Sequence, residues 1–259
     1  MDLDLKGKTA VVTGASRGIG LAIARALAEE GAVVVGGARN ISAELTDITR
    51  HTLPVNLSTP SGAGELVDYA LSEVGGIDIL VNNLGAPATR TAGFLAVDDD
   101  GWAEMLDTNL LIAVRATRAA LPSIIERRGS IVNIGSTNGR LPLPVVIDYS
   151  AAKAALLSFG KSLSEEFGPV GVRVNTVSAG PVMTDAWVAP GGIADSLAQQ
   201  SGVTREQIVE GVPAMLGLST GAATTPEEIA AVVALIASRK IPNLNGSEFI
   251  IDGGLLKAA

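Results

Sequence analysis

The chain has 259 residues, 47% of them hydrophobic, and a formal net charge of −8 at neutral pH. This length and composition fit one large domain, and the acidic charge argues against nucleic acid or an anionic membrane surface as a partner. The sequence contains no cysteine, which excludes disulfides and thiolate metal sites and suits a reducing interior. We find no signal peptide or spanning helix in it and expect a cytoplasmic protein.

Short β-branched runs alternate along the chain with longer segments of helical periodicity. The expected strands are 9–12, 33–35, 53–55, 79–81, 131–134, 172–177 and 249–251. The expected helices are 18–30, 62–74, 101–126, 149–167 and 226–238, with a short or irregular one inside 39–51. This alternation is typical of repeated βαβ units. We therefore predict an α/β fold, a Rossmann-like, doubly wound parallel sheet of about seven strands with helices on both faces.

We expect residues 1–259 to form a single domain, because the sequence shows no repeat and no linker. The stretch 184–224 breaks the alternation, since glycine and proline interrupt a weak helical pattern there. It is predicted to leave the sheet as a lid or loop insertion over a substrate. Trp187 lies inside this stretch, and either covers an apolar substrate or packs ordinarily.

A glycine-rich loop follows the first expected strand and opens the first helix, with the sequence Thr13-Gly14-Ala15-Ser16-Arg17-Gly18-Ile19-Gly20. Gly14 permits a tight turn, Gly18 lets the backbone approach a pyrophosphate, and Gly20 lets the helix pack close to the sheet. The loop lacks the Gly-Lys-Ser/Thr ending of a P-loop. Its position between strand and helix predicts dinucleotide binding.

The end of the second expected strand bears on the choice between the two nicotinamide dinucleotides. An acidic residue there would bond the ribose hydroxyls and repel a 2′-phosphate, but Gly36, Gly37 and Ala38 occupy that end. Arg39 follows at once, and Arg17 lies in the glycine loop, so two guanidiniums can clamp a phosphate. We predict that NADP(H) is preferred and NAD(H) is possible; the alternative is that both arginines are simply solvated.

Tyr149 and Lys153 stand four residues apart, so a helix places them on one face. A phenol with a pKa near 10 needs its anion stabilised before it can act as an acid and base at neutral pH. Lowering that pKa by ~3 units requires roughly 4 kcal/mol of preferential interaction, which one ammonium and a cationic ring can supply. Because Tyr and Lys share this spacing on many solvated helices, the pair alone proves little.

The remaining motifs occur in a fixed order: Thr13 to Gly20, Asn82-Asn83-Leu84-Gly85, Asn109, Ser136 and Tyr149 to Lys153. In combination they resemble the short-chain dehydrogenase/reductase family, in its single-domain branch, and the resemblance covers nearly the whole chain. Segments 174–184 and 251–254 add the family's usual landmarks in the carboxyl half. Overall, the chain is similar to bacterial 3-oxoacyl reductases.

The resemblance implies a catalytic set of Asn109, Ser136, Tyr149 and Lys153. Tyr149 would be the general acid in reduction and the base in oxidation, and Ser136 would hydrogen-bond the substrate oxygen. Lys153 would hold the nicotinamide ribose and depress the tyrosine pKa, and Asn109 would position a water beside the lysine. Structural alternatives are a turn cap for Ser136 and an ordinary helix-breaking role for Asn109.

The resemblance also implies a set of cofactor-binding residues, with three departures from the family pattern. Asn56 stands where the family usually has an adenine-contacting aspartate, Leu84 replaces a usual alanine, and Ala179 replaces a usual proline before Gly180. No metal site is expected, since His51 lacks companions and Asp98 to Asp100 are interpreted as a helix cap. The cofactor set is Gly14, Ser16, Arg17, Gly18, Ile19, Gly20, Arg39, Asn56, Leu57, Asn83, Gly85, Tyr149, Lys153, Pro181, Val182 and Thr184.

These expectations favour an NADPH-dependent reductase of a small-molecule ketone or 3-oxoacyl substrate. The alternatives are an NAD(P)-dependent secondary-alcohol, polyol or steroid dehydrogenase, and a non-catalytic NADP(H)-sensing protein. The apolar stretch Leu141 to Val146 is interpreted as a pocket wall or as a buried loop anchor. The small side chains of Ala151, Ala152, Ala154 and Ala155 fit the helix-mediated homotetramer or homodimer that the resemblance implies.

Overall fold

The computed structural model describes residues 2–190 and 192–257, which form one parallel sheet in the order β3-β2-β1-β4-β5-β6-β7. The order reverses between β1 and β4, as it does in a doubly wound fold. The predicted class is confirmed. The strands are β1 (Thr9–Thr13), β2 (Val33–Ala38), β3 (His51–Pro54), β4 (Ile79–Asn82), β5 (Ser130–Ser136), β6 (Arg173–Ala179) and β7 (Glu248–Ile251).

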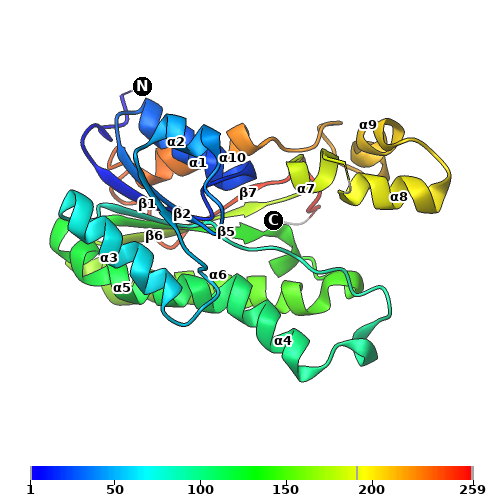
Figure 1. Ribbon diagram of the computed structural model, residues 1–259, viewed down its shortest axis with the longest axis horizontal. Coiled ribbons are helices and arrows are strands. Elements are labelled where there is room, and N and C mark those ends of the chain that lie inside the picture. Colours follow the sequence, from blue (N-terminus) through cyan, green and yellow to red (C-terminus); the bar gives the residue numbers. More distant parts are fainter. Residues whose placement is uncertain (1, 191, 258–259) are drawn as a thin grey trace.

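Helices cover both faces of this sheet (Figure 1), with α1, α2 and α10 on one face and α3, α5 and α6 on the other. Because successive residues of a strand face opposite sides, Val12 and Val11 of β1 enter two separate hydrophobic cores, one in each layer. The helices are α1 (Gly18–Glu29), α2 (Ala43–Ile48), α3 (Gly62–Val74), α4 (Asp99–Leu106), α5 (Ile112–Arg127), α6 (Ile147–Phe167), α7 (Asp185–Val188), α8 (Ile193–Ser201), α9 (Arg205–Met215) and α10 (Pro226–Ala237).

The single helix expected over 101–126 differs from the structure in two respects. The observed helix starts earlier, at Asp99, because the Asp98 side chain accepts a hydrogen bond from Gly101 N at 2.9 Å. It is also divided, because a π-helical turn, Asp107–Leu111, separates α4 from α5. Asp107, Thr108 and Asn109 make the start of this turn polar, and helical periodicity does not distinguish a π-helical turn from an α-helical one. The short helix expected inside 39–51 is α2, and the expected start of α10 is a capping box at Thr225.

The stretch 184–224 leaves the sheet through a narrow neck. Val182 and Thr224 form an isolated parallel bridge, in which Met183 N donates to Thr224 O at 3.0 Å and Thr224 N donates to Pro181 O at 3.1 Å. Helices α7, α8 and α9 project beyond this neck, at the carboxyl side of the strands (Figure 1). The arrangement fits an insertion, and its role as a lid stays a prediction. In the described part of the chain, no helix combines the length and apolar character needed to cross a membrane.

The tight packing of α1 against the glycine loop makes Gly20 a sensitive position. A Cβ added there would lie 2.2 Å from Gly14 O and 2.5 Å from Asn83 Nδ2, so the backbone must move. We expect Gly20→Ala to lower the free energy of unfolding by about 1–3 kcal/mol. Urea denaturation measures this change.

Gly64 in α3 is the matched control, since no atom lies within 4 Å of its added Cβ. Gly64→Ala should be neutral or should stabilise by about 0.5–1 kcal/mol, because alanine loses less chain entropy in a helix. Equal effects of the two substitutions would contradict the assigned contact.

Candidate active site

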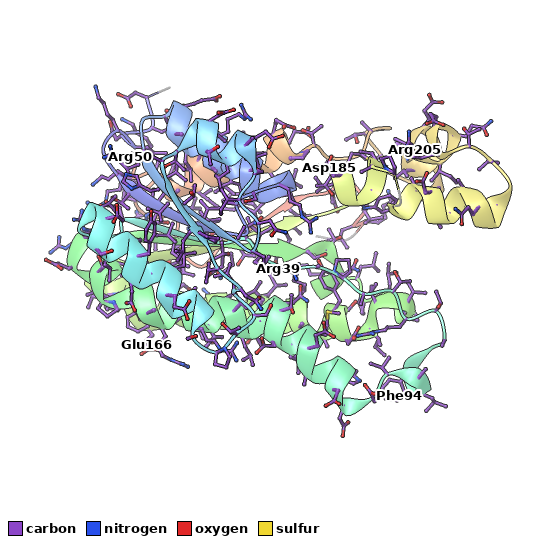
Figure 2. All side chains as sticks on the ribbon, in the orientation of Figure 1. Arg39, Arg50, Phe94, Glu166, Asp185 and Arg205 are labelled. Carbon is purple, nitrogen blue, oxygen red and sulfur yellow. The ribbon has the colours of Figure 1, made fainter. Side chains whose placement is uncertain are left out.

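Parallel strands bring the predicted site residues to one edge of the sheet. The glycine loop follows β1, Asn83 follows β4, Ser136 ends β5, and the neck of the insertion follows β6. Ligands of doubly wound folds bind at such carboxyl ends, where the strand order reverses. Figure 2 shows two projections on this side, one carrying Asp185 at α7 and the other carrying Phe94 beyond α4.

The glycine loop is held from the neighbouring strand end. Asn83 Nδ2 donates to Thr13 O at 2.8 Å and to Gly14 O at 3.2 Å, while Thr13 Oγ1 accepts from Asn83 N and Leu84 N. Gly14 and Gly18 have φ values of +67° and +53°, in the region that favours glycine. Asn83 therefore fixes the loop, and Leu84 packs over Gly14, 3.0 Å from an added Cβ.

The loop has the features that a dinucleotide pyrophosphate requires. The first turn of α1 carries no acidic residue, and its N-cap residue Arg17 makes no side-chain capping bond, so the amide ends face outward from the helix. A Cβ on Gly18 would come within 3.3 Å of Thr184 Cγ2, so the loop and the neck border one narrow space. Pro181 and Val182 lie in that same neck.

The two arginines predicted to select the cofactor are both exposed. Within the described residues, neither guanidinium makes a side-chain hydrogen bond or an ion pair, and both are available to an anion. Figure 2 shows Arg39 near the middle of the view, at the carboxyl end of β2. Ser16 Oγ accepts from Ser42 N at 3.4 Å, which ties the glycine loop to the start of α2.

Two of the predicted cofactor-binding residues, Asn56 and Leu57, have side chains that are less available to a cofactor. Leu57 is buried in the core that contains Val11, so its side chain packs internally and a cofactor contact there would use its backbone. Asn56 is exposed, and its Oδ1 accepts from Ser58 N at 3.2 Å. Its amide is therefore partly used within its own turn.

Lys153 and Tyr149 lie together on α6, as predicted. Lys153 is buried, donates from Nζ to Ile134 O at 2.9 Å, and has that nitrogen 5.7 Å from the centroid of the Tyr149 ring. The Ser136 side chain acts on the Tyr149 phenol by lowering its pKa, and Ser136 Oγ also accepts from Asn138 N at 3.2 Å. A Cβ on Gly85 would lie 2.9 Å from Lys153 Nζ and 2.8 Å from Asn109 Oδ1, so the glycine opens the space between these atoms.

The pKa of the Tyr149 phenol is raised in the protein alone. Burial raises the pKa of Tyr149 above its ordinary value, although the hydrogen bond from Ser136 opposes this shift. Burial also lowers the pKa of Lys153 to about 8, so most of the lysine stays protonated at neutral pH. The expected depression of the tyrosine pKa combines the lysine with a cationic ring, so the shift caused by the chain's own groups does not test it, and it stays a prediction.

Asn109 lies in the π-helical turn, and its side chain is fully occupied. Its Oδ1 accepts from Ala86 N at 3.0 Å, and its Nδ2 donates to Ala86 O at 3.0 Å and to Met105 O at 3.1 Å. The asparagine thus anchors the segment after β4 beside Lys153. A water-positioning role, if present, would fall to its backbone and stays a prediction.

The apolar stretch Leu141 to Val146 is expected from the sequence to form either a pocket wall or a buried loop anchor. Leu141, Leu143 and Val145 in the segment before α6 are all exposed, which supports a pocket wall over an internal anchor. Trp187 is half-buried, and its backbone N–H donates to Thr184 O at 2.8 Å. Sequence analysis also missed Arg90 and Asp148, which form an ion pair directly before Tyr149. Among the described residues, no group of three or more His, Cys, Asp or Glu side chains is arranged to hold a metal ion.

Comparison with known proteins assigns the family. A family model described as enoyl-(acyl carrier protein) reductase matches residues 14–256. The 3-oxoacyl-[acyl-carrier-protein] reductase of Vibrio cholerae serotype O1 is 36% identical over 260 residues, which cover 98% of this chain and 99% of that protein. The corresponding reductase of Escherichia coli K12 is 35% identical with the same coverage.

Solved structures agree with this assignment. L-sorbose reductase from Gluconobacter frateurii, complexed with NADPH and L-sorbose, superimposes with a TM-score of 0.93 at 31% identity over the whole of both chains. Aldohexose dehydrogenase from Thermoplasma acidophilum gives a TM-score of 0.87 at 26% identity, covering 100% of this chain and 98% of the other. The chain belongs to the short-chain dehydrogenase/reductase family. It is an oxidoreductase that acts on CH–OH and C=O groups.

Burial of Lys153 predicts a specific pH dependence of stability. The pKa is about 8 in the folded protein and 10.5 for the ordinary group, so between these values the unfolded state binds more protons. The free energy of unfolding should therefore rise with pH across this window, by roughly 3 kcal/mol in total. Urea denaturation at several pH values between these limits measures the rise.

Lys153→Met should remove this rise, because methionine binds no proton in either the folded or the unfolded state. Lys161→Met on the same helix is the control, since Lys161 is exposed and should leave the slope unchanged. A slope that survives in Lys153→Met would show that the buried lysine does not cause it.

Proposed function

We propose that the protein is an NADPH-dependent reductase that converts a ketone or 3-oxoacyl substrate to the secondary alcohol. The proposal rests on one arrangement: Lys153 is buried beside Tyr149, and Ser136 acts on the same phenol at the sheet edge that also carries the glycine loop. A sensor that only binds a nucleotide has no use for a phenol paired with a buried ammonium. The family membership supports the same conclusion.

The roles of the three side chains follow from their chemistry. Ser136 donates a hydrogen bond to the carbonyl oxygen, and Tyr149 transfers its hydroxyl proton to that oxygen. Lys153, protonated at neutral pH, stabilises the phenolate that remains. When bound, the reduced nicotinamide supplies the hydride to the carbonyl carbon. One hydride and one proton convert the ketone to the alcohol, and the reverse oxidation uses Tyr149 as the base.

The preference for NADPH is supported by Arg17 and Arg39, which are exposed and make no other ion pair in the described part of the chain. Charge-assisted hydrogen bonds from guanidiniums suit an additional phosphate. The similar L-sorbose reductase was solved with NADPH. Gly14, Ser16, Gly18, Ile19, Gly20, Asn83, Gly85, Pro181, Val182 and Thr184 complete the proposed binding surface.

The apolar, exposed rim formed by Leu141, Leu143 and Val145 favours a substrate with an apolar portion, such as a 3-oxoacyl chain. The 3-oxoacyl reductases among the relatives support this choice. A sugar or polyol is the second candidate, because the L-sorbose reductase fold matches over the entire chain. In either case the substrate is a small-molecule carbonyl or alcohol compound.

Assembly and location belong to the same proposal. Ala151 and Ala154 of α6 are exposed, whereas Ala152 is buried, so the helix offers a small-sided outer surface to another subunit. We infer a homotetramer or homodimer formed through this surface. The absence of cysteine supports a cytoplasmic location, and the insertion 184–224 is proposed to close over the substrate.

Replacing the catalytic phenol tests the proposed chemistry. Tyr149→Phe should lower turnover of ketone substrates by about 10²- to 10⁴-fold, because the general acid is lost. NADPH binding, followed by nucleotide fluorescence, should be largely preserved. Tyr69→Phe changes the only other tyrosine and should leave turnover unchanged. Retained turnover in Tyr149→Phe would refute the assigned role.

The cofactor preference has its own test. Arg39→Ser should lower kcat/KM for NADPH by about 10- to 100-fold, the worth of a charge-assisted hydrogen bond, while kcat/KM for NADH stays nearly constant. Arg25→Ser on the exposed side of α1 is the control and should affect neither cofactor. If both cofactors lose efficiency in parallel in Arg39→Ser, the arginine does not recognise the extra phosphate.

A further inference from the structure

An ion pair between Arg90 and Asp148 lies directly before the catalytic tyrosine. Arg90 donates from Nε at 2.8 Å and from Nη2 at 2.6 Å to Asp148 Oδ2. The other oxygen, Oδ1, accepts the backbone N–H of Tyr149 at 2.9 Å. The Asp148 side chain is 0% exposed. Both carboxylate oxygens are therefore used, one by the arginine and one by the tyrosine backbone.

Arg90 also joins this start of α6 to two other segments. Its backbone N–H donates to Val145 O at 2.7 Å, in the apolar stretch that leads into α6. Its Nη2 lies 3.5 Å from Gly101 O in α4. The segment between β4 and α4 that carries Arg90 also contains Gly85 and Ala86, which border Lys153 and Asn109. Through Asp148, the Arg90 side chain thus connects the backbone of Tyr149 to the segment that borders Lys153.

The buried charge of Asp148 also needs a compensating cation. A buried carboxylate one residue from Tyr149 would oppose formation of a phenolate unless a cation compensates it. Arg90 supplies that cation, and its side chain is only 23% exposed. The hydrogen bond with Asp148 raises the pKa of Arg90, and Glu104 and Asp98 at α4 add smaller contributions. Lys153 faces the tyrosine ring from one turn further along α6.

We propose that Arg90 is a positioning residue that acts through Asp148. It holds the first turn of α6 so that the Tyr149 hydroxyl meets Ser136, and it cancels the carboxylate charge beside the phenol. The inference rests on the proposed function, because it concerns the proton transfer assigned to Tyr149. It also makes a structural prediction that is independent of turnover.

The structural prediction is tested on the protein without added cofactor. Hydrogen exchange of the peptide covering 147–150 should be faster in Arg90→Met than in the wild type, because Asp148 loses the partner that holds it against Tyr149 N. Arg127→Met is the matched control: it removes an arginine from Asp78, a carboxylate 8% exposed at the amino ends of the strands. It should leave exchange in 147–150 unchanged. Unchanged exchange in Arg90→Met overturns the proposal, whatever the activity of the protein.

The catalytic prediction uses turnover and its pH dependence. Arg90→Met should lower kcat by about 10- to 100-fold, because the hydroxyl is displaced from its partners, while the KM for NADPH changes little. The pH at which alcohol oxidation reaches half its maximum should rise, because the uncompensated carboxylate disfavours the phenolate. Arg90→Lys should restore part of kcat.

The double variant Arg90→Met/Asp148→Asn separates charge from packing. Asparagine retains an oxygen acceptor for Tyr149 N but carries no charge, so the pH midpoint should return toward that of the wild type. A midpoint that stays the same in all variants overturns the electrostatic part of the proposal. If the wild type reduces no carbonyl compound, the proposed function fails, and the exchange experiment still decides the positioning role.

Discussion

The site depends on one interaction, a buried ammonium placed against a phenol. Burial lowers the pKa of Lys153 to about 8. A buried ammonium is unfavourable unless a hydrogen-bond partner compensates it, and such groups are often found at functional sites. The carbonyl of Ile134 is the partner, and it is part of the strand that ends at Ser136. The same strand therefore stabilises the lysine and presents the serine to Tyr149.

The fold delivers this interaction through a few close contacts. Parallel strands align their carboxyl ends, and α6 crosses that edge with Tyr149 and Lys153 on its inner face. Gly85 leaves room for Lys153 Nζ and Asn109 Oδ1, and Gly20 lets α1 approach the loop at Gly14. A larger side chain at either position would prevent these close contacts. The two glycines are therefore required by the lack of space at these positions.

Much of this could be predicted from the sequence, because it depends on local patterns. The β-branched runs located the strands, and the order of glycine, asparagine, serine, tyrosine and lysine motifs indicated where the site would form. The rest depends on burial and on contacts distant in sequence. The rise in the Tyr149 pKa comes from desolvation, which no spacing reports. Arg90 and Asp148 are 58 residues apart, and helical periodicity does not distinguish the π-helical turn at Asn109 from the helices on either side.

The direction of the Tyr149 pKa shift bears on which groups stabilise the phenolate. The chain's own residues leave the pKa of this phenol above its ordinary value. When bound, an oxidised nicotinamide would supply positive charge that stabilises the anion.

Tyrosinate absorbance, titrated in a Tyr69→Phe background so that Tyr149 is the sole tyrosine, measures this most directly. We expect a Tyr149 pKa above its ordinary value in the protein alone and a lower pKa on saturation with NADP⁺. A pKa that NADP⁺ leaves unchanged would contradict the claim that the phenol and the dinucleotide act as one acid–base unit.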